Sequence, residues 1–349
     1  MKILYVGFNE LHHTADKVYL NGLRSNGVEV VECFLPVRGV KRYLSLLNCF
    51  LRHRRSIGCL VVGYASPQAV VFLRLLTMKR IIYNAVSSEY ERMVVSRGLA
   101  KPLSIKGFYY WLLDFFASHC ASLVMLESQH QIDYFCQLFK VSKKKCLLAW
   151  TGVDDRVFYY DKKIANFSQF TVMFRGRLLP ESGAENVVAA AKKLENDGVQ
   201  FIMVANGFWL TKIQVLIGQL KPTNLRLITE HLSDDELRTL MQQSHLSLGQ
   251  LSNHPRVWRT IPHKAYESLA LKLPYLTARN PAVMELLTED QTCLACNPAD
   301  PADLAEKIRW AKNNSEKITA VAENGYRLLQ QQLTPKMLAS NLLTHITRR

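Results

Sequence analysis

The sequence FTVMFRGRLLPESGAENVVAAAKKL, residues 170–194, decides the expected fold. Apolar residues occupy every second position at its start, which is the period of a half-buried strand. Gly176, Pro180 and Gly183 then mark a turn, and apolar residues recur at helical spacing from Ala184 onward. We therefore predict a strand, a glycine-bounded loop and a helix, the unit from which parallel α/β sheets are built.

A loop of this kind directs backbone N–H groups and the positive end of a helix dipole toward the space above the sheet. Arg177 adds a fixed positive charge at this place, so the pattern is consistent with an anion-binding site. The same pattern also fits an ordinary connection between a strand and a helix that carries a surface arginine. The segment by itself leaves both interpretations open.

Strands alternate with helices on both sides of this segment. In the first half, strands are expected at residues 2–7, 28–35, 59–63, 80–85 and 122–127. In the second half, they are expected to follow at 201–204, 225–228, 246–248 and 275–277. Two predicted capping boxes, Ser128 with Gln131 and Ser233 with Glu236, begin helices. This alternation predicts two α/β sheets whose carboxyl strand ends border a common cleft.

The composition is that of a globular chain with material for about two domains. The 349 residues are 48% hydrophobic and 21% charged. Eight cysteines without regular spacing indicate free thiols in a reducing compartment, and Cys293-Leu-Ala-Cys296 lacks the second ligand pair of a zinc site. No export signal opens the sequence, and Asp114 and His119 interrupt the most apolar run, 108–126. We expect a cytoplasmic protein.

The net charge of +15 is concentrated in one region. Residues 38–106 contain 13 lysines and arginines against only Glu89 and Glu91, which leaves an excess of 11 positive charges. Within this region, residues 41–55 predict a basic amphipathic helix, which suits either a solvated surface or contact with an anionic membrane. Nucleic acid also suits the charge, but we find no motif that reads bases and expect no nucleic-acid partner.

Three separated segments resemble the donor-binding half of family 4 glycosyltransferases, which have the GT-B fold. Residues 176–183 (GRLLPESG) match the family's Gly-Arg-Leu and Pro-Glu-Lys-Gly-like loop, and residues 267–274 (ESLALKLP) match the second half of its Glu-x7-Glu helix. Residues 152–158 (GVDDRVF) are similar to its domain junction. The resemblance implies two Rossmann-like domains facing each other across a cleft, a UDP- or GDP-linked sugar donor, no metal, and retention of anomeric configuration.

The resemblance also implies roles for single residues. Arg177 matches the arginine that binds the donor diphosphate, and Glu267 matches the glutamate that holds the ribose hydroxyls. Two positions depart from the family. Ser182 replaces the loop lysine, and Arg259 stands where the first glutamate of Glu-x7-Glu is expected. An arginine cannot accept hydrogen bonds, so Arg259 cannot take over that glutamate's role.

The segment Ile261-Pro262-His263-Lys264 is similar to a family variant, Ile-Pro-x-Lys-x-x-Glu. Lys264 and Glu267 are three residues apart and share one helix face. Our hypothesis is that Lys264 supplies the cation that Ser182 does not; the alternative is a solvated lysine paired with Glu267. The expected donor-binding residues are Gly176, Arg177, Ser182, Arg259, Ile261, Pro262, Lys264 and Glu267, of which Arg177 and Lys264 are expected to be catalytic.

On the acceptor side the sequence offers fewer candidates. Asn9, His12 and His13 lie in the first loop after a strand, where they could orient an acceptor or simply be loop residues. Glu89 belongs to the one acidic segment of the basic region. It is our candidate for a catalytic base, a role that needs a carboxylate within hydrogen-bond reach of the attacking oxygen.

The resulting prediction is an α/β GT-B enzyme. We expect an acceptor-binding domain at 1–152, a nucleotide-sugar-binding domain at 153–334, and a helix at 335–349 that returns to the first domain. The expected function is that of a metal-independent hexosyltransferase, peripheral to the inner face of the cell membrane. It would transfer a sugar to a lipid-linked or polysaccharide acceptor in cell-surface glycan synthesis. The alternatives are a catalytically weak relative that binds sugar nucleotides or glycans as a partner subunit, and a nucleic-acid-binding protein supported by charge alone.

Overall fold

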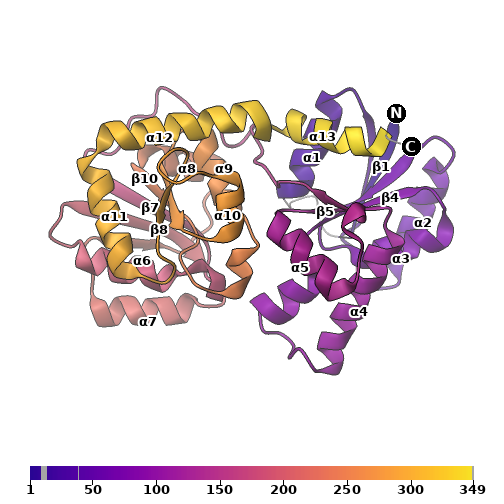
Figure 1. The fold of residues 1–349 in the computed structure, drawn as a ribbon, viewed down its shortest axis with the longest axis horizontal. Coiled ribbons are helices and arrows are strands. Elements are labelled where there is room, and N and C mark those ends of the chain that lie inside the picture. The colour runs from indigo at the N-terminus through magenta and orange to yellow at the C-terminus, as the bar shows by residue number, and fades with distance from the viewer. Residues whose placement is uncertain (9–13, 38, 348–349) are drawn as a thin grey trace. The chain divides into compact units, whose positions relative to one another are not determined.

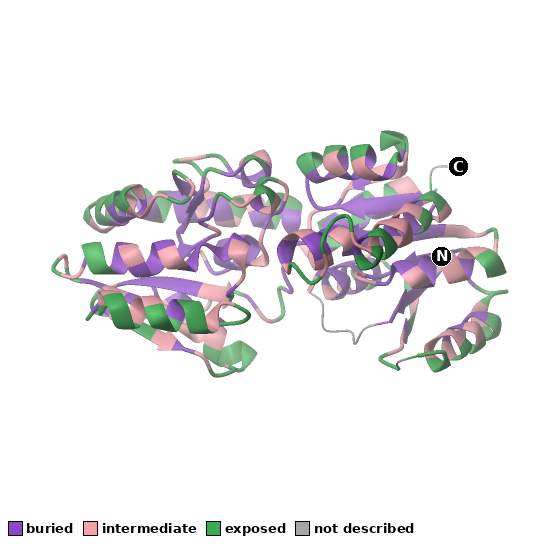
Figure 2. Cartoon of the chain, turned by 90° about the horizontal axis from the view of Figure 1, so that it is seen from below, coloured by how far each residue is buried: buried purple, intermediate pink, exposed green. Residues whose placement is uncertain are grey.

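The computed structural model describes residues 1–8, 14–37 and 39–347. The chain divides into two compact units. Unit 1 comprises Met1–Asp154 and Leu333–Arg349, and unit 2 comprises Asp155–Gln332. Each unit contains one six-stranded parallel sheet with helices on both faces (Figures 1 and 2). Both units are therefore Rossmann-like, as the alternation of strands and helices predicts.

Unit 1 is built around the strand order β2-β1-β3-β4-β5-β6. Its strands are β1 (Lys2–Gly7), β2 (Glu29–Phe34), β3 (Cys59–Val62), β4 (Arg80–Val86), β5 (Leu123–Leu126) and β6 (Cys146–Leu148). Its helices are α1 (Thr14–Ser25), α2 (Lys41–His53), α3 (Pro67–Leu76), the π-helical η1 (Glu91–Ser96), α4 (Ile105–Cys120), α5 (Gln129–Phe139), the 3-10 helix η2 (Lys143–Lys145) and α13 (Pro335–Thr347). The strand order reverses between β1 and β3, and open α/β sheets bind ligands outside the carboxyl ends of the strands at such a point.

Unit 2 has the strand order β12-β11-β10-β7-β8-β9. Its strands are β7 (Phe170–Arg177), β8 (Val199–Asn206), β9 (Leu225–Ile228), β10 (Leu246–Leu248), β11 (Tyr275–Ala278) and β12 (Leu294–Cys296). Its helices are η3 (Pro180–Ser182), α6 (Ala184–Lys193), α7 (Leu210–Leu220), α8 (Asp234–Gln243), η4 (Pro255–Trp258), α9 (His263–Ala270), α10 (Pro281–Leu286), α11 (Pro301–Asn313) and α12 (Ser315–Leu328), after which the π-helical η5 (Leu329–Leu333) leads out of the unit. The strand order reverses between β7 and β10, the strands that end at Arg177 and Leu248.

Burial explains why these short apolar runs are strands. Every residue of β3, β5, β10, β11 and β12 is buried, as expected for parallel strands covered on both faces. The strand–loop–helix expected at 170–194 is present as β7, η3 and α6. Gly183 joins η3 to α6 with a φ of +67°, and a Cβ there would lie 2.5 Å from the backbone of Leu251. Only glycine accommodates both the conformation and the close approach.

The structure corrects several local expectations. Ser233 and Glu236 form the predicted capping box, but the box predicted at Ser128 is not closed. Ser128 accepts a hydrogen bond from the Gln131 backbone, whereas the Gln131 side chain donates to Glu91. Strand β8 is longer at both ends than the predicted 201–204. Helices α7, α10 and α12, strand β12 and the π-helix η1 were not predicted.

Candidate functional site

The carboxyl end of β7 carries an unpaired cation. Arg177 is the last residue of β7, and its side chain is exposed. Among the described residues it has no hydrogen-bond or ion-pair partner. Gly176, immediately before it, has a φ of +142° and leaves the neighbouring space open to the side chain of Lys264. The arginine is therefore available to a ligand at the strand-order reversal of unit 2.

Lys264 lies beside Gly176 as a buried amine. It sits in the first turn of α9, is only 8% exposed, and donates from Nζ to the carbonyl oxygen of Gly249 at 3.1 Å, just after β10. Its Nζ also lies 4.1 Å from the ring centroid of Phe174 and 3.6 Å from the position a Cβ would take at Gly176. The alternative of a solvated lysine paired with Glu267 is therefore wrong. The Lys264 amine bridges the ends of the two strands that flank the reversal.

Burial changes the protonation of Lys264. Loss of water lowers the pKa of this amine from 10.5 to about 7, and the nearby charge of Arg175 contributes to the lowering, while Glu267 opposes it. The amine is thus close to half protonated at neutral pH. An anion placed beside it would favour the ammonium form, so ligand binding and proton uptake are coupled at this position.

Glu267 has a partner that the sequence did not reveal. Its carboxylate is 2% exposed and accepts two hydrogen bonds from the guanidinium of Arg175, one of them at 2.7 Å from Nε. Arg175 and Arg177 are two residues apart in β7, and alternate residues of a strand point to the same face, a spacing that could have drawn attention to Arg175. The Arg175 pair leaves Glu267 lone pairs for other donors, so its ribose role stays a prediction.

The remaining donor-side candidates lie around these groups. Ser182 is buried and donates its hydroxyl hydrogen bond to the carbonyl of Leu179 at 2.7 Å, so it braces η3 and does not replace the missing lysine. Arg259 follows η4 and is half-buried. Ile261 is buried, and Pro262 caps α9 without a side-chain hydrogen bond. Arg259, Ile261 and Pro262 belong to the segment between η4 and Lys264. The contact of these three residues and of Ser182 with a donor stays a prediction.

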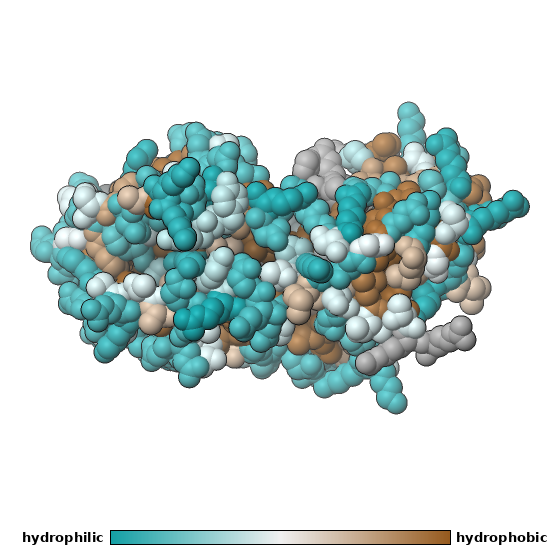
Figure 3. All heavy atoms as spheres, turned by 90° about the horizontal axis from the view of Figure 1, so that it is seen from above, coloured by the Kyte–Doolittle hydropathy of each residue, from teal (hydrophilic) through white to brown (hydrophobic). Residues whose placement is uncertain are grey.

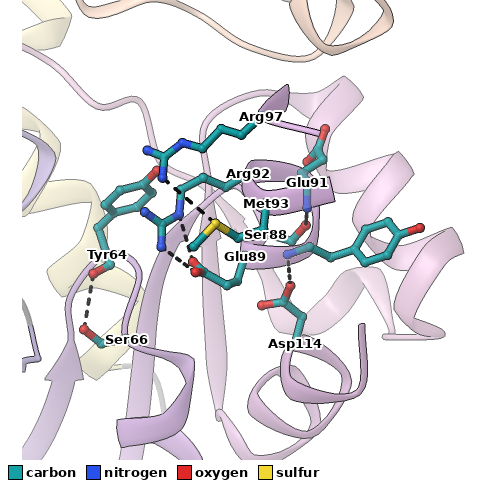
Figure 4. A network of polar contacts seen from close by, with 10 residues as sticks. Tyr64, Ser66, Ser88, Glu89, Glu91, Arg92, Met93, Arg97 and Asp114 are labelled. Atoms are coloured by element: carbon teal, nitrogen blue, oxygen red, sulfur yellow. Dashed lines mark hydrogen bonds and ion pairs between the residues drawn. The ribbon is translucent and has the colours of Figure 1, made fainter. Parts of the chain in front are cut away.

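A second polar cluster lies in unit 1, at the carboxyl end of β4 (Figure 4). The Glu89 carboxylate accepts two hydrogen bonds from Arg92, one of them at 2.9 Å from Nε. Glu89 is only 7% exposed, so the ion pair is largely shielded from water. Arg92 therefore orients the Glu89 carboxylate, and the role of Glu89 as the catalytic base stays a prediction.

Asp114 of α4 holds the turn that leads into this cluster. Its Oδ2 accepts from the backbone N–H of Tyr90 at 2.7 Å, while the Ser88 hydroxyl accepts from the N–H of Glu91 at 2.9 Å. Asp114 is 1% exposed. Burial raises the pKa of its carboxyl from 3.8 to about 8, against the opposing hydrogen bonds from backbone N–H groups. The carboxyl group is therefore largely protonated at neutral pH.

The substitution Asp114→Asn is expected to flatten the pH dependence of stability. Between the unfolded pKa near 3.8 and the folded pKa of about 8, the folded state binds the additional proton, so the free energy of unfolding falls as pH rises. An asparagine side chain would keep an acceptor for the Tyr90 N–H without titrating. We expect the midpoint of thermal unfolding to decline less between pH 6 and 8 in the variant, measured by circular dichroism. An identical slope in both proteins would contradict the shifted pKa.

Asp16 anchors the loop after β3 in the same unit. Its carboxylate is buried and accepts from Tyr5 Oη and Asn84 Nδ2, both at 2.9 Å, and from the Tyr64 backbone N–H at 3.1 Å. Burial raises the pKa of Asp16 to about 6. Nothing in the sequence singled out Asp16 or Tyr64. The candidates Asn9, His12 and His13 lie outside the described residues.

The described residues contain neither a candidate metal cluster nor a candidate membrane-spanning helix. Within residues 1–8, 14–37 and 39–347, no group of three or more His, Cys, Asp or Glu side chains is arranged to hold a metal ion. In the same residues, no helix combines the length and apolar character needed to cross a bilayer. The eight cysteines are free, and Cys293 and Cys296 are buried just before β12 and at its end.

The architecture of the chain has counterparts among known proteins. Residues 160–328 match the family model described as "Glycosyl transferases group 1". The two six-stranded Rossmann-like units and the solved structures that share this architecture confirm the predicted GT-B fold.

Individual proteins resemble the chain at low sequence identity. The uncharacterised glycosyltransferase MJ1178 of Methanocaldococcus jannaschii is 22% identical over 222 residues, which cover 64% of this chain and 58% of that protein. HepE of Anabaena, solved with UDP and glucose, has a TM-score of 0.75 at 15% identity, with 99% of each chain covered. Sucrose-phosphate synthase of Thermosynechococcus elongatus has a TM-score of 0.75 at 13% identity and covers 99% of this chain and 98% of its own. These structures share the fold.

Proposed function

We propose that the protein is a glycosyltransferase that transfers a sugar from a nucleotide-sugar donor, UDP- or GDP-linked, held by unit 2. The observation that supports this most directly is the pair of basic side chains at the end of β7, an exposed Arg177 and a buried Lys264 beside Gly176. Stabilising the leaving diphosphate is the main electrostatic task when a glycosidic bond breaks without a metal. Solved structures of HepE contain UDP and UDP-glucose, which is consistent with a donor of this kind.

Each donor-side residue has a role in this proposal. Arg177 and Lys264 bind the diphosphate, and Glu267, held by Arg175, accepts hydrogen bonds from the ribose. Gly176 gives the phosphates access to the backbone, while Ser182, Arg259, Ile261 and Pro262 line the loops around them. The reaction proceeds without a metal and with retention of configuration, as in the family 4 enzymes that the motifs resemble, and the sugar is a hexose.

Direct binding experiments test the donor assignment. Calorimetric titration of the full chain with UDP, GDP and their glucose conjugates is expected to show that one nucleotide series binds. Arg177→Gln is expected to weaken that binding at least about tenfold, since a charge-assisted phosphate contact contributes about 1.5–3 kcal/mol. Arg226→Gln, on β9, is the matched control and should bind like the wild type. If neither series binds, the proposed function is wrong.

A partner subunit with little catalytic power is the second candidate. Two observations favour it: the Ser182 hydroxyl is engaged with the backbone where the family has a lysine, and Arg259 replaces a sugar-binding glutamate. Such a protein would bind the nucleotide sugar without transferring the sugar. Incubation of labelled donor with a lipid-linked acceptor distinguishes the two, because only the enzyme forms labelled product.

The acceptor proposal concerns unit 1. We propose a lipid-linked or polysaccharide acceptor in cell-surface glycan synthesis, presented to a cytoplasmic enzyme at the inner face of the membrane. Figure 3 shows brown, apolar side chains reaching the surface of unit 1, in the right half of the view, among teal polar ones. Helix α2 buries Leu46 and Phe50 but exposes Leu44 and Leu51, and its flanks are basic. An exposed apolar row bordered by cations suits the interface of an anionic bilayer.

Charge placed on this row is expected to release the protein from membranes. The double variant Leu44→Glu and Leu51→Glu should reduce co-sedimentation with phosphatidylglycerol-containing vesicles about tenfold, because two leucines leave the interface and two anions face the lipid. Val215→Glu, at an exposed position of α7, is the matched control. Equal sedimentation of all three proteins would refute α2 as the contact surface.

A further inference from the structure

The end of β4 and the segment after it contain two unusual backbone features in succession. Val86 ends β4 with a φ of +60°, which a β-branched residue rarely adopts, and the register with β5 shifts between Asn84 and Val86. Residues Glu91–Ser96 then form a π-helix, a rare conformation that is frequently found at functional sites. Both features cost conformational energy, and such features persist where the surrounding structure holds them in place.

The π-helix brings Arg92 and Arg97 together. The backbone N–H of Arg97 donates to the carbonyl of Arg92 at 3.3 Å, which is the i to i+5 bond of a π-turn. In an α-helix, residues five apart would point about 140° away from each other, since each residue turns the chain by about 100°. In the structure, both guanidinium groups extend toward the ring of Tyr64, which follows β3 (Figure 4). The guanidinium carbon of Arg92 lies 5.9 Å from the centroid of that ring.

The surrounding contacts fix this pair in position. Glu89 accepts from Nε and Nη2 of Arg92, so the Nη1 group lies on the side of the guanidinium away from that carboxylate. Arg97 extends over the sulfur of Met93, 4.0 Å from its Nη1. The Asp16 carboxylate accepts a hydrogen bond from the backbone N–H of Tyr64, just after β3. These contacts hold two guanidinium groups beside one aromatic ring at the carboxyl ends of β3 and β4.

We propose that Arg92 and Arg97 form a phosphate-binding site in unit 1, with Tyr64 as its wall. The planar guanidinium group binds phosphate oxygens through paired N–H donors, and two guanidinium groups aligned by a π-turn match one tetrahedral anion. The site takes a phosphate ester carried by the acceptor, an assignment that rests on the proposed function. The same chemistry could instead serve the phosphates of the donor nucleotide, and the experiment separates these two sources.

Inorganic phosphate is the probe for the site itself. Titration of the full chain is followed by the ³¹P linewidth of phosphate, with and without saturating UDP or GDP. We expect wild-type binding to persist when nucleotide is present, and Arg97→Gln, which leaves the pair of Arg92 with Glu89 intact, to weaken it at least fivefold. The double variant with Arg92→Gln should abolish it. Arg327→Gln, at an exposed position of α12, is the matched control.

The outcomes distinguish this inference from the proposed function. Unchanged phosphate binding in the Arg97→Gln and double variants would overturn the site. If nucleotide displaces phosphate, or if Arg97→Gln weakens nucleotide and phosphate binding equally, the pair serves the donor and the acceptor assignment is wrong. If no nucleotide binds the wild type while phosphate binding still depends on Arg97, the proposed function fails and the phosphate site stands. Thermal unfolding of each variant verifies that it is folded.

Discussion

Nucleoside diphosphate binding to the wild-type chain is expected to weaken about tenfold for each pH unit above 7, with uptake of a proton. Lys264 is the reason. Its folded pKa is about 7, so the free protein loses the ammonium charge above that pH, and an anionic ligand must restore it. The expectation applies between pH 7 and about 9, where a nucleoside diphosphate itself keeps a constant charge. Calorimetry in buffers of different ionisation enthalpy measures the proton uptake directly.

Two variants separate this effect from other causes. Lys264→Met removes the charge and keeps the apolar stem, so it should bind nucleotide weakly at every pH and without proton uptake. Lys193→Met, at an exposed position of α6, should retain both the wild-type affinity and its pH dependence. If Lys264→Met keeps the wild-type pH dependence, another group titrates and the role proposed for Lys264 is wrong.

The lowered pKa of Lys264 also affects the stability of the unliganded protein. Between pH 7 and 10.5 the unfolded chain binds a proton at Lys264 that the folded chain does not, so this residue makes the free energy of unfolding rise with pH. The trend is opposite in sign to the one expected from Asp114. The lysine destabilises the folded state most below pH 7, which is typical of a group held in place for function.

Removal of Glu267 is expected to destabilise unit 2 by about 3 kcal/mol. Glu267→Ala leaves the charge of Arg175 without its carboxylate, in a region that also contains the Lys264 amine. The loss of stability should be near the lower end of the range for broken buried ion pairs, because the Arg175 side chain is 25% exposed. Urea-induced unfolding of the full chain, monitored at the transition of unit 2, measures this loss of unfolding free energy.

A matched pair of variants tests this explanation. Glu289→Ala breaks a similar two-bond contact with Arg279, but both side chains are more exposed, so the expected loss is below about 1 kcal/mol. The double variant Arg175→Met and Glu267→Leu should be more stable than Glu267→Ala, because it removes both charges of the pair and leaves none unpaired. If the double variant is as unstable as Glu267→Ala, the Glu267 carboxylate stabilises unit 2 in another way than by neutralising Arg175.

Local pattern was sufficient for most of the fold. Alternating apolar residues predict β7, Gly183 predicts the turn, and helical spacing of apolar residues predicts α6. Each of these signals depends on residues that are neighbours in the sequence, so the sequence alone is enough to find the element. The capping box at Ser233 was predictable for the same reason. At Ser128 the prediction was wrong because Gln131 found a tertiary partner, Glu91, that neighbouring sequence does not specify.

Sequence by itself determined the two α/β sheets, the cation at the end of β7 and the lysine at the start of α9, since each depends on residues close together in the chain. Only the tertiary structure decided which charges meet. Arg175 holds Glu267, Lys264 becomes a buried amine between two strand ends, and a π-turn aligns Arg92 with Arg97. Burial and pairing depend on surfaces brought together from distant segments, and the free energies of desolvation and Coulomb attraction that set protonation exist only once those surfaces meet.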